Sequence, residues 1–168
     1  MALSVGSALE PNCQFLKGYS PESRVGDYDA PATATDQGTV VKLDTDGVTL
    51  AVCTDQDGQY MLEQAVDASG PTGSAANREK WLQGIPQSIV LISTKVSVQP
   101  IKSGCEIRTS KIATGTETGA VTAASITPGV TLAETYNGIF RVRQGTNDYV
   151  GIFMSEPDAN GRVRILFV

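Results

Sequence analysis

Two short runs of the chain bring carboxylates together in a spacing that could hold calcium. The runs are DTDG at residues 44–47 and DQDG at residues 55–58. Alternate aspartates can turn their oxygens into one loop, and calcium takes oxygen ligands. In both runs, however, glycine is the fourth residue, whereas an EF-hand needs glycine sixth and a glutamate twelfth. We interpret both runs as turns, and an irregular, weak calcium site stays open as the alternative.

Four glutamates in the C-terminal half could supply a pair of catalytic carboxylates: Glu106, Glu117, Glu134 and Glu156. Two carboxylates that face each other across a cleft can hydrolyse a glycosidic bond. No aromatic-rich motif surrounds these glutamates to stack sugar rings, so we interpret them as solvated side chains. A carboxylate glycosidase is the main enzymatic alternative.

Other catalytic chemistry lacks its usual residues. The chain has no histidine, which is the commonest general acid or base and a frequent metal ligand. Neither a GxxxxGK[ST] nor a GxGxxG phosphate-binding string occurs. The three cysteines, Cys13, Cys53 and Cys105, are far apart without a CxxC spacing, so we expect reduced, buried thiols. The sequence therefore predicts a protein that is not an enzyme, without a catalytic residue, metal or cofactor.

The charge of the chain argues against two classes of partner. The net charge is −5 and the isoelectric point is near 4.7. Nucleic acids and anionic membranes bind clustered lysine and arginine, so we expect neither as a partner. No run approaches 18 apolar residues, and the first residues lack the pattern of a secretory signal. We expect a soluble protein made in the cytoplasm.

Residues 38–168 carry the pattern of a single β-rich domain. Three β-rich runs follow Gly38, separated by the turn dipeptides Asp46-Gly47 and Asp57-Gly58, and this predicts a β-meander. Further strands are expected at residues 88–98, 104–109, 120–124, 138–144, 149–154 and 162–168. Short strands at this spacing predict a mainly all-β fold, either a small β-barrel or a β-tulip or sandwich.

One short helix is expected near residues 74–83. Ser74 is placed as its N-cap, Gly84 follows at the C-cap position, and Pro86 lies beyond. This helix would carry Trp81, which we interpret as a residue that docks the helix on the core. An anchor at an interface is the alternative for this tryptophan.

Residues 1–37 are predicted to form an extended N-terminal arm. They contain three prolines and show no sustained period of a helix or a strand. Their large apolar side chains are too many for a solvated tail, so we expect the arm to pack on its own domain or on a neighbouring subunit. The predicted partner-binding residues combine this arm with the tryptophan of the helix: Phe15, Tyr19, Pro21, Arg24, Tyr28 and Trp81.

Residues 96–143 resemble the head decoration, or capsid cement, proteins of tailed bacteriophages. The similar pattern begins with a glycine-initiated strand and continues through a Gly/Thr-rich loop, an Ala/Val strand, a Gly-Val-x-Leu step and a glycine-led amphipathic strand. In this chain the successive parts are residues 104–108, the loop around 115–119, and residues 121–124, 129–132 and 138–143.

This resemblance implies a function as well as a fold. It implies a β-barrel or β-tulip-like domain that forms a homotrimer and binds the major capsid protein on the outer surface of the capsid. The arm would lie across neighbouring capsid subunits, and the protein would belong to the virion after assembly in the host cytoplasm. The alternatives are a tail or head-fibre component, or a carbohydrate-binding or adhesin module.

Overall fold

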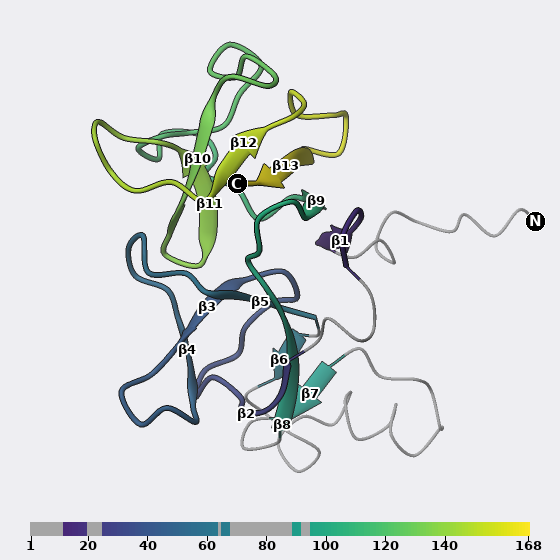
Figure 1. The fold of residues 1–168 in the computed structure, drawn as a ribbon, viewed down its shortest axis with the longest axis vertical. Helices are drawn as coiled ribbons and strands as arrows, with labels where there is room; N and C mark the ends of the chain where they lie inside the picture. The colour runs from purple at the N-terminus through teal and green to yellow at the C-terminus, as the bar shows by residue number, and fades with distance from the viewer. Residues whose placement is uncertain (1–11, 20–24, 64, 68–88, 92–94) are drawn as a thin grey trace, which may run out of the picture.

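The computed structural model describes residues 12–19, 25–63, 65–67, 89–91 and 95–168. In this part of the chain the protein is all-β, with thirteen strands and no helix (Figure 1). This confirms the predicted fold class. The helix expected near residues 74–83 lies outside the described residues, as does Trp81.

The first sheet contains six antiparallel strands and is barrel-shaped. Its order is β1-β9-β13-β12-β10-β11. The ring is nearly closed because the chain that continues from β9 reaches the far edge, where Phe140 and residues 111–113 exchange two backbone hydrogen bonds of 2.9 Å. The strands are β1 (Cys13–Phe15), β9 (Glu106–Thr109), β10 (Leu132–Tyr136), β11 (Ile139–Val142), β12 (Gly151–Phe153) and β13 (Val163–Phe167).

The second sheet contains five strands in the order β2-β8-β5-β3-β4, and it lies below the first in Figure 1. Its outer strands meet at one point, where the amide of Asp29 donates to the carbonyl of Val48 at 2.9 Å. The strands are β2 (Val25–Asp29), β3 (Val40–Leu43), β4 (Leu50–Val52), β5 (Tyr60–Leu62) and β8 (Lys95–Pro100). Two further strands, β6 (Ala65–Asp67) and β7 (Ile89–Leu91), form a parallel pair.

The predicted meander is wrong, because β3 pairs with both β4 and β5. The Asp46-Gly47 turn does join neighbouring antiparallel strands. The loop with Asp57-Gly58 instead carries the chain across β3 to its other side. A dipeptide favours a turn through its own backbone preferences, but it does not decide which strands pair on either side.

Strands β3 and β5 of the five-stranded sheet lie between the hydrophobic cores of the two sheets. Successive side chains of a strand point to opposite faces. Val40 and Met61, which are direct partners across these strands, belong to the hydrophobic core of the six-stranded barrel. Val41 and Leu62, the next residue on each strand, belong to a second core inside the five-stranded sheet. One layer of backbone therefore supports both cores.

The C-terminal strands agree in part with the pattern of the sequence. Val163, Ile165 and Phe167 are buried on one face of β13, as the alternation in RVRILFV predicts. The expected strand at 120–124 is wrong, because these residues form turns and loops, and β10 was not expected. Strands β1 and β2 both fall within residues 1–37, the predicted arm, and they pair with β9 and β8.

Candidate functional site

The described residues of the predicted partner-binding set lie at two separate places. The rings of Phe15 and Tyr19 meet edge to face at 5.2 Å and pack against the core of the six-stranded barrel. The hydroxyl of Tyr19 donates to the carbonyl of Pro100 at 2.8 Å. Tyr28 lies on the other sheet, with its ring 5.5 Å from that of Tyr60. Pro21, Arg24 and Trp81 lie outside the described residues.

Leu16, the residue that directly follows β1, was not among the predicted partner-binding residues. Cys13 and Phe15 face the barrel core, so Leu16 turns outward, and 42% of its surface is exposed. The side-chain amide of Gln37 binds the backbone of Cys13. Its oxygen accepts from the N–H of Cys13 and its nitrogen donates to the carbonyl of Cys13, at 2.8 Å each. The alternation in CQFL could have identified Leu16 once a strand was assigned there.

The two acidic runs are turns in the structure. A carboxylate oxygen of Asp46 accepts from the amides of Val48 and Thr49 at 2.8 Å each, and the hydroxyl of Thr49 donates to the other oxygen at 2.6 Å. These bonds, the Thr49 hydroxyl first, hold the pKa of Asp46 below its ordinary value. Within the described residues, no group of three or more candidate ligands is placed to hold a metal ion.

In the second acidic run, residues 55–58, the aspartate carboxylate likewise accepts hydrogen bonds from its own loop. Asp57 accepts from the backbone amides of Thr54 and Asp55, and its carboxylate pairs with the ammonium group of Lys42. Burial would raise the pKa of Asp57, but the hydrogen bond from Lys42 and the backbone amides hold it below its ordinary value. The carboxylates of both runs thus complete their own loops.

All three cysteines are free and buried, as the sequence predicts. Burial raises the pKa of the Cys13 thiol to about 12 and that of Cys53 to about 11. Burial likewise raises the pKa of the Tyr19 hydroxyl well above its ordinary range. These shifts mark protonated groups of the core, since a reactive thiol needs a lowered pKa and exposure.

Two of the four glutamates that were interpreted as solvated are buried instead. Glu106 pairs with Arg164 across β9 and β13, with 2.5 Å between the nearest atoms. Glu134 is fully buried and accepts from the Nε of Arg141 at 2.6 Å. Glu117 and Glu156 are exposed. Glu106 and Glu134 can be buried because each has an arginine partner on a neighbouring strand, and a paired and hydrogen-bonded charge can be buried.

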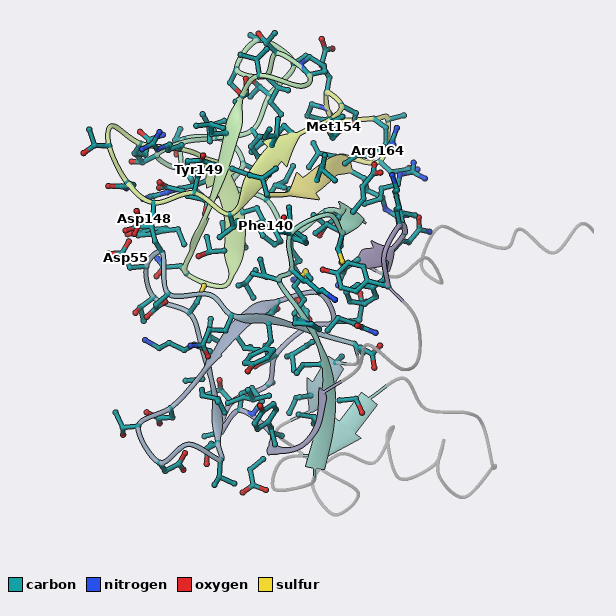
Figure 2. All side chains as sticks on the ribbon, in the orientation of Figure 1. Asp55, Phe140, Asp148, Tyr149, Met154 and Arg164 are labelled. Atoms are coloured by element: carbon teal, nitrogen blue, oxygen red, sulfur yellow. The ribbon has the colours of Figure 1, made fainter. Side chains whose placement is uncertain are left out.

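The Glu134–Arg141 pair is the centre of a polar cluster on the outer face of the β10–β11 hairpin. The other carboxylate oxygen of Glu134 accepts from the backbone N–H of Gln144 at 3.2 Å. The side-chain amide of Asn147 donates to the first oxygen at 3.3 Å. The guanidinium of Arg141 stacks on the ring of Tyr136, 3.6 Å from its centroid. Phe140, labelled in Figure 2, lies in the barrel core on the opposite face of the same hairpin.

The sequence contains a dipeptide that predicts the pairing of Glu134 with Arg141. The Asn137-Gly138 dipeptide forms the two-residue turn of the hairpin, and both residues have positive φ, as such a turn requires. Counting outward from the turn places Glu134 directly opposite Arg141, as the strand register shows. This dipeptide was not among the predicted turns, so the pairing of Glu134 with Arg141 was not predicted.

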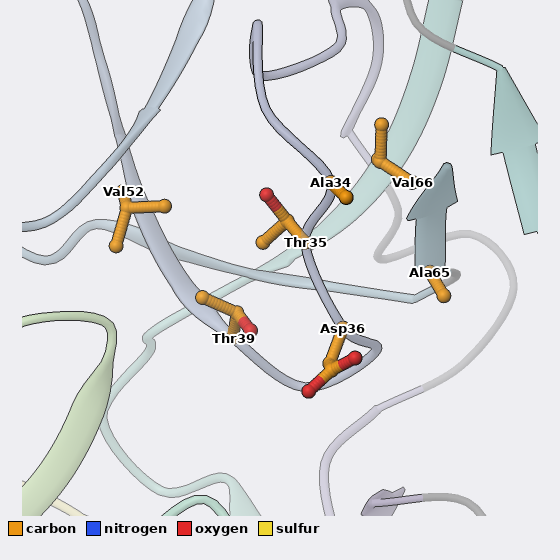
Figure 3. Close-up of a pocket in the computed structure, with 7 residues that line it drawn as sticks. All are labelled: Ala34, Thr35, Asp36, Thr39, Val52, Ala65 and Val66. Atoms are coloured by element: carbon orange, nitrogen blue, oxygen red, sulfur yellow. The ribbon is translucent and has the colours of Figure 1, made fainter. Parts of the chain in front are cut away.

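Of the cavities at the surface of the described part, three differ clearly in their lining. The first, shown in Figure 3, has a volume of about 440 Å³ and a lining of small side chains with one carboxylate, that of Asp36. That carboxylate already pairs with Lys111 at 2.5 Å. The second, of about 560 Å³, lies between the two sheets beside Tyr60, Pro100 and Tyr149.

The third cavity has the most varied polar chemistry. It has a volume of about 620 Å³ and adjoins the polar cluster of the hairpin. Its lining includes the guanidinium of Arg141 beside the exposed side chains of Glu117, Thr118 and Asn137. This cavity is therefore the candidate small-ligand site of the protein, whereas Leu16 marks a candidate surface for a protein partner.

Comparison with known proteins adds no name to these sites. No protein-family model matches the chain, and neither a curated protein nor a solved structure matches it. Among the described residues, no helix is long and apolar enough to cross a membrane.

Proposed function

We propose that this chain is a non-catalytic structural protein of a virion that decorates a phage capsid. It would bind the outer surface of the major capsid protein as a homotrimer. The observation that carries the proposal is Leu16, which is exposed directly after β1, a strand that the N-terminal segment adds to the barrel. A partner surface that covers this side chain would remove its apolar area from water.

The packing behind Leu16 supports this role. Cys13 and Phe15 lie in or against the barrel core, and Gln37 binds the backbone of Cys13, so the strand that directly precedes Leu16 is held in place. A rigid anchor loses little conformational entropy when it binds. In a symmetric shell, several copies of one modest contact add up to tight attachment through effective concentration.

Most of the segment that resembles the decoration proteins belongs to the barrel, although its first residues form most of β8 in the five-stranded sheet. It contributes β9, β10 and β11, with β12 and β13 between β9 and β10 in the sheet order, and a loop of residues 111–119 that hydrogen-bonds to β11. The resemblance and the Leu16 surface are thus parts of the same barrel, and we expect that barrel to contact the capsid.

The test uses the full chain and a matched pair of substitutions. Leu16→Asp places a charge on the proposed surface, and Val130→Asp places the same charge on a loop, where 68% of Val130 is exposed. Each variant is mixed with particles assembled from the major capsid protein of the same genome, and cosedimentation is measured. We expect Leu16→Asp to lose binding by tenfold or more, and Val130→Asp to bind as the unchanged chain does.

Three outcomes contradict the proposal. The first is that the unchanged chain does not sediment with capsids, or sediments only with tails. The second is that Leu16→Asp binds normally, which would remove β1 from the contact. The third is a monomeric mass by light scattering at micromolar concentration, which would exclude the homotrimer. Melting curves of both variants check that the fold is kept.

A further inference from the structure

We propose that the cavity beside the β10–β11 hairpin binds a neutral, polyhydroxylated ligand, such as a monosaccharide unit of a glycan. This site is independent of the capsid contact at Leu16. It is lined by Arg141 from β11, Tyr136 and Asn137 from the hairpin, and Glu117 and Thr118 from the loop that follows residue 113.

The guanidinium of Arg141 is the first reason. Arg141 is only 7% exposed, its Nε donates to Glu134, and one face of its planar group stacks on Tyr136. No hydrogen bond joins its two Nη groups to a described residue, and they are not among the fully buried unpaired atoms, so they reach solvent where the residue lines the cavity. A buried guanidinium has five N–H donors, so those that face the cavity need acceptors from a ligand or water.

The rim of the cavity is the second reason. Glu117 uses one carboxylate oxygen to accept from the amide of Thr114 at 2.5 Å, which fixes the carboxylate and leaves the other oxygen for a donor. The amide of Asn137 and the hydroxyl of Thr118 can each donate and accept. A ligand that satisfies this lining must present donors and acceptors side by side.

Charge decides the ligand class. The positive charge of Arg141 is balanced by Glu134 behind it, and Glu117 adds a negative charge at the rim. An anion would meet the carboxylate of Glu117 and an arginine whose charge Glu134 already compensates, and a cation would meet the guanidinium, so each would lose part of its Coulomb energy. Neighbouring hydroxyls carry no charge, and each can both donate to Glu117 and accept from Arg141.

The fold also favours a preformed cavity. Gly119 packs so closely that an added Cβ would lie 2.7 Å from the carbonyl of Val142 and 3.1 Å from the Cδ of Arg141. The loop is thereby held against β11, where the amide of Val142 donates to the carbonyl of Gly119 at 2.9 Å. A site whose walls are already placed loses less free energy to ordering when a ligand enters.

The experiment titrates the full-length protein with free glucose, galactose, mannose, rhamnose and N-acetylglucosamine, followed by protein NMR, and then screens a glycan array. Sodium acetate, inorganic phosphate and ethylammonium chloride test the charged classes. We expect saturable binding of at least one sugar, with shifts at residues 117–119 and 136–141. We expect no comparable binding of the three ions.

Three substitutions test the lining. Glu117→Gln changes an exposed carboxylate, and Asn137→Gly removes the amide while keeping a residue that tolerates positive φ. Arg141→Lys keeps the charge opposite Glu134 but removes the fork of donors. Glu117→Gln and Arg141→Lys should each weaken sugar binding by about tenfold, the effect of one hydrogen bond to a charged group, and Asn137→Gly by about threefold, the effect of a neutral one. The control Glu156→Gln, an exposed carboxylate outside the cavity, should leave binding unchanged.

Several results would overturn the proposal. One is that none of the sugars binds at tens of millimolar and the glycan array is empty. Another is that acetate, phosphate or ethylammonium binds more tightly than every sugar. A third is that Glu117→Gln and Asn137→Gly both melt normally and bind sugar as the unchanged chain does, which would place the sugar elsewhere.

Discussion

Glu134 and Arg141 face each other across the β10–β11 hairpin, with the Nε of the arginine 2.6 Å from the carboxylate of the glutamate. Neither side chain is more than 8% exposed. Each therefore depends on the other to compensate a charge that has lost most of its water.

Replacing Glu134 with alanine should destabilise the protein strongly. Arg141 would remain buried without its carboxylate, and breaking such a pair costs about 3–5 kcal/mol. Urea unfolding measures the loss. The double substitution Glu134→Leu with Arg141→Leu should cost less than Glu134→Ala alone, because no charge is then left uncompensated.

A surface substitution serves as the control for this pair. Glu156→Ala removes an exposed carboxylate and should change stability by no more than about 0.5 kcal/mol. If Glu134→Ala costs as little as Glu156→Ala, the buried pair does not exist in solution.

A matched pair of glycine substitutions tests how the two sheets dock. Gly138 and Gly129 have φ of +80° and +78°, so alanine is strained similarly at both, by about 1 kcal/mol. An added Cβ at Gly138 would lie 2.8 Å from Cγ1 of Val52 and 2.9 Å from Cγ2 of Thr39, whereas at Gly129 it meets nothing within 4 Å.

We therefore expect Gly138→Ala to cost about 1–3 kcal/mol more than Gly129→Ala, because only Gly138 is packed against the other sheet. Thermal or urea unfolding of the two variants gives the comparison. Equal losses would mean that the hairpin does not contact β3 and β4 as described.

Stability should fall at alkaline pH. The ordinary pKa of a cysteine is 9.0, and burial raises that of Cys13 to about 12 and that of Cys53 to about 11. The unfolded chain releases these protons near pH 9 while the folded chain keeps them. The stabilising contribution of each thiol is complete below pH 9 and is lost as the pH rises toward its folded value.

Urea unfolding at successive pH values above 8 measures this loss. Each thiol contributes a slope of up to about 1.4 kcal/mol per pH unit between its two pKa values. Cys13→Ala should make the slope shallower, whatever its effect on stability at neutral pH. A variant whose slope equals that of the unchanged chain would show that Cys13 is not buried.

Within the turn of residues 44–47, Asp46 should contribute most of the stabilisation, and calcium should contribute none. Asp46→Ala removes three hydrogen bonds to Val48 and Thr49 and should cost about 1 kcal/mol. Asp44→Ala should cost less, because the Asp44 carboxylate bonds only to its neighbour Thr45.

Calcium and chelators provide the independent measurement for this turn. A ligand that binds only the folded state must raise the melting temperature by mass action. We expect no change in millimolar calcium. A rise of several degrees that a chelator reverses would revive the weak calcium site.

The sequence by itself determined the features that depend on neighbouring residues. The all-β class followed from short β-branched runs, and the buried face of β13 followed from alternation in RVRILFV. The turn at Asp46-Gly47 was predicted for the same reason, since a turn depends on the backbone preferences of its own residues. The burial of three widely spaced thiols also followed from residue type and spacing.

Only the tertiary structure decided which segments meet. The pairing of β1 with β9 joins residues more than ninety positions apart, and β3 took β5 as its second partner against the predicted meander. Glu134 lies on the outer face of a hairpin, where a local pattern indicates solvent, yet it is fully buried beside Gln144 and Asn147. This burial comes from the loop that follows β11 and folds back over the strand, and the alternation of side chains along a strand does not predict such a contact.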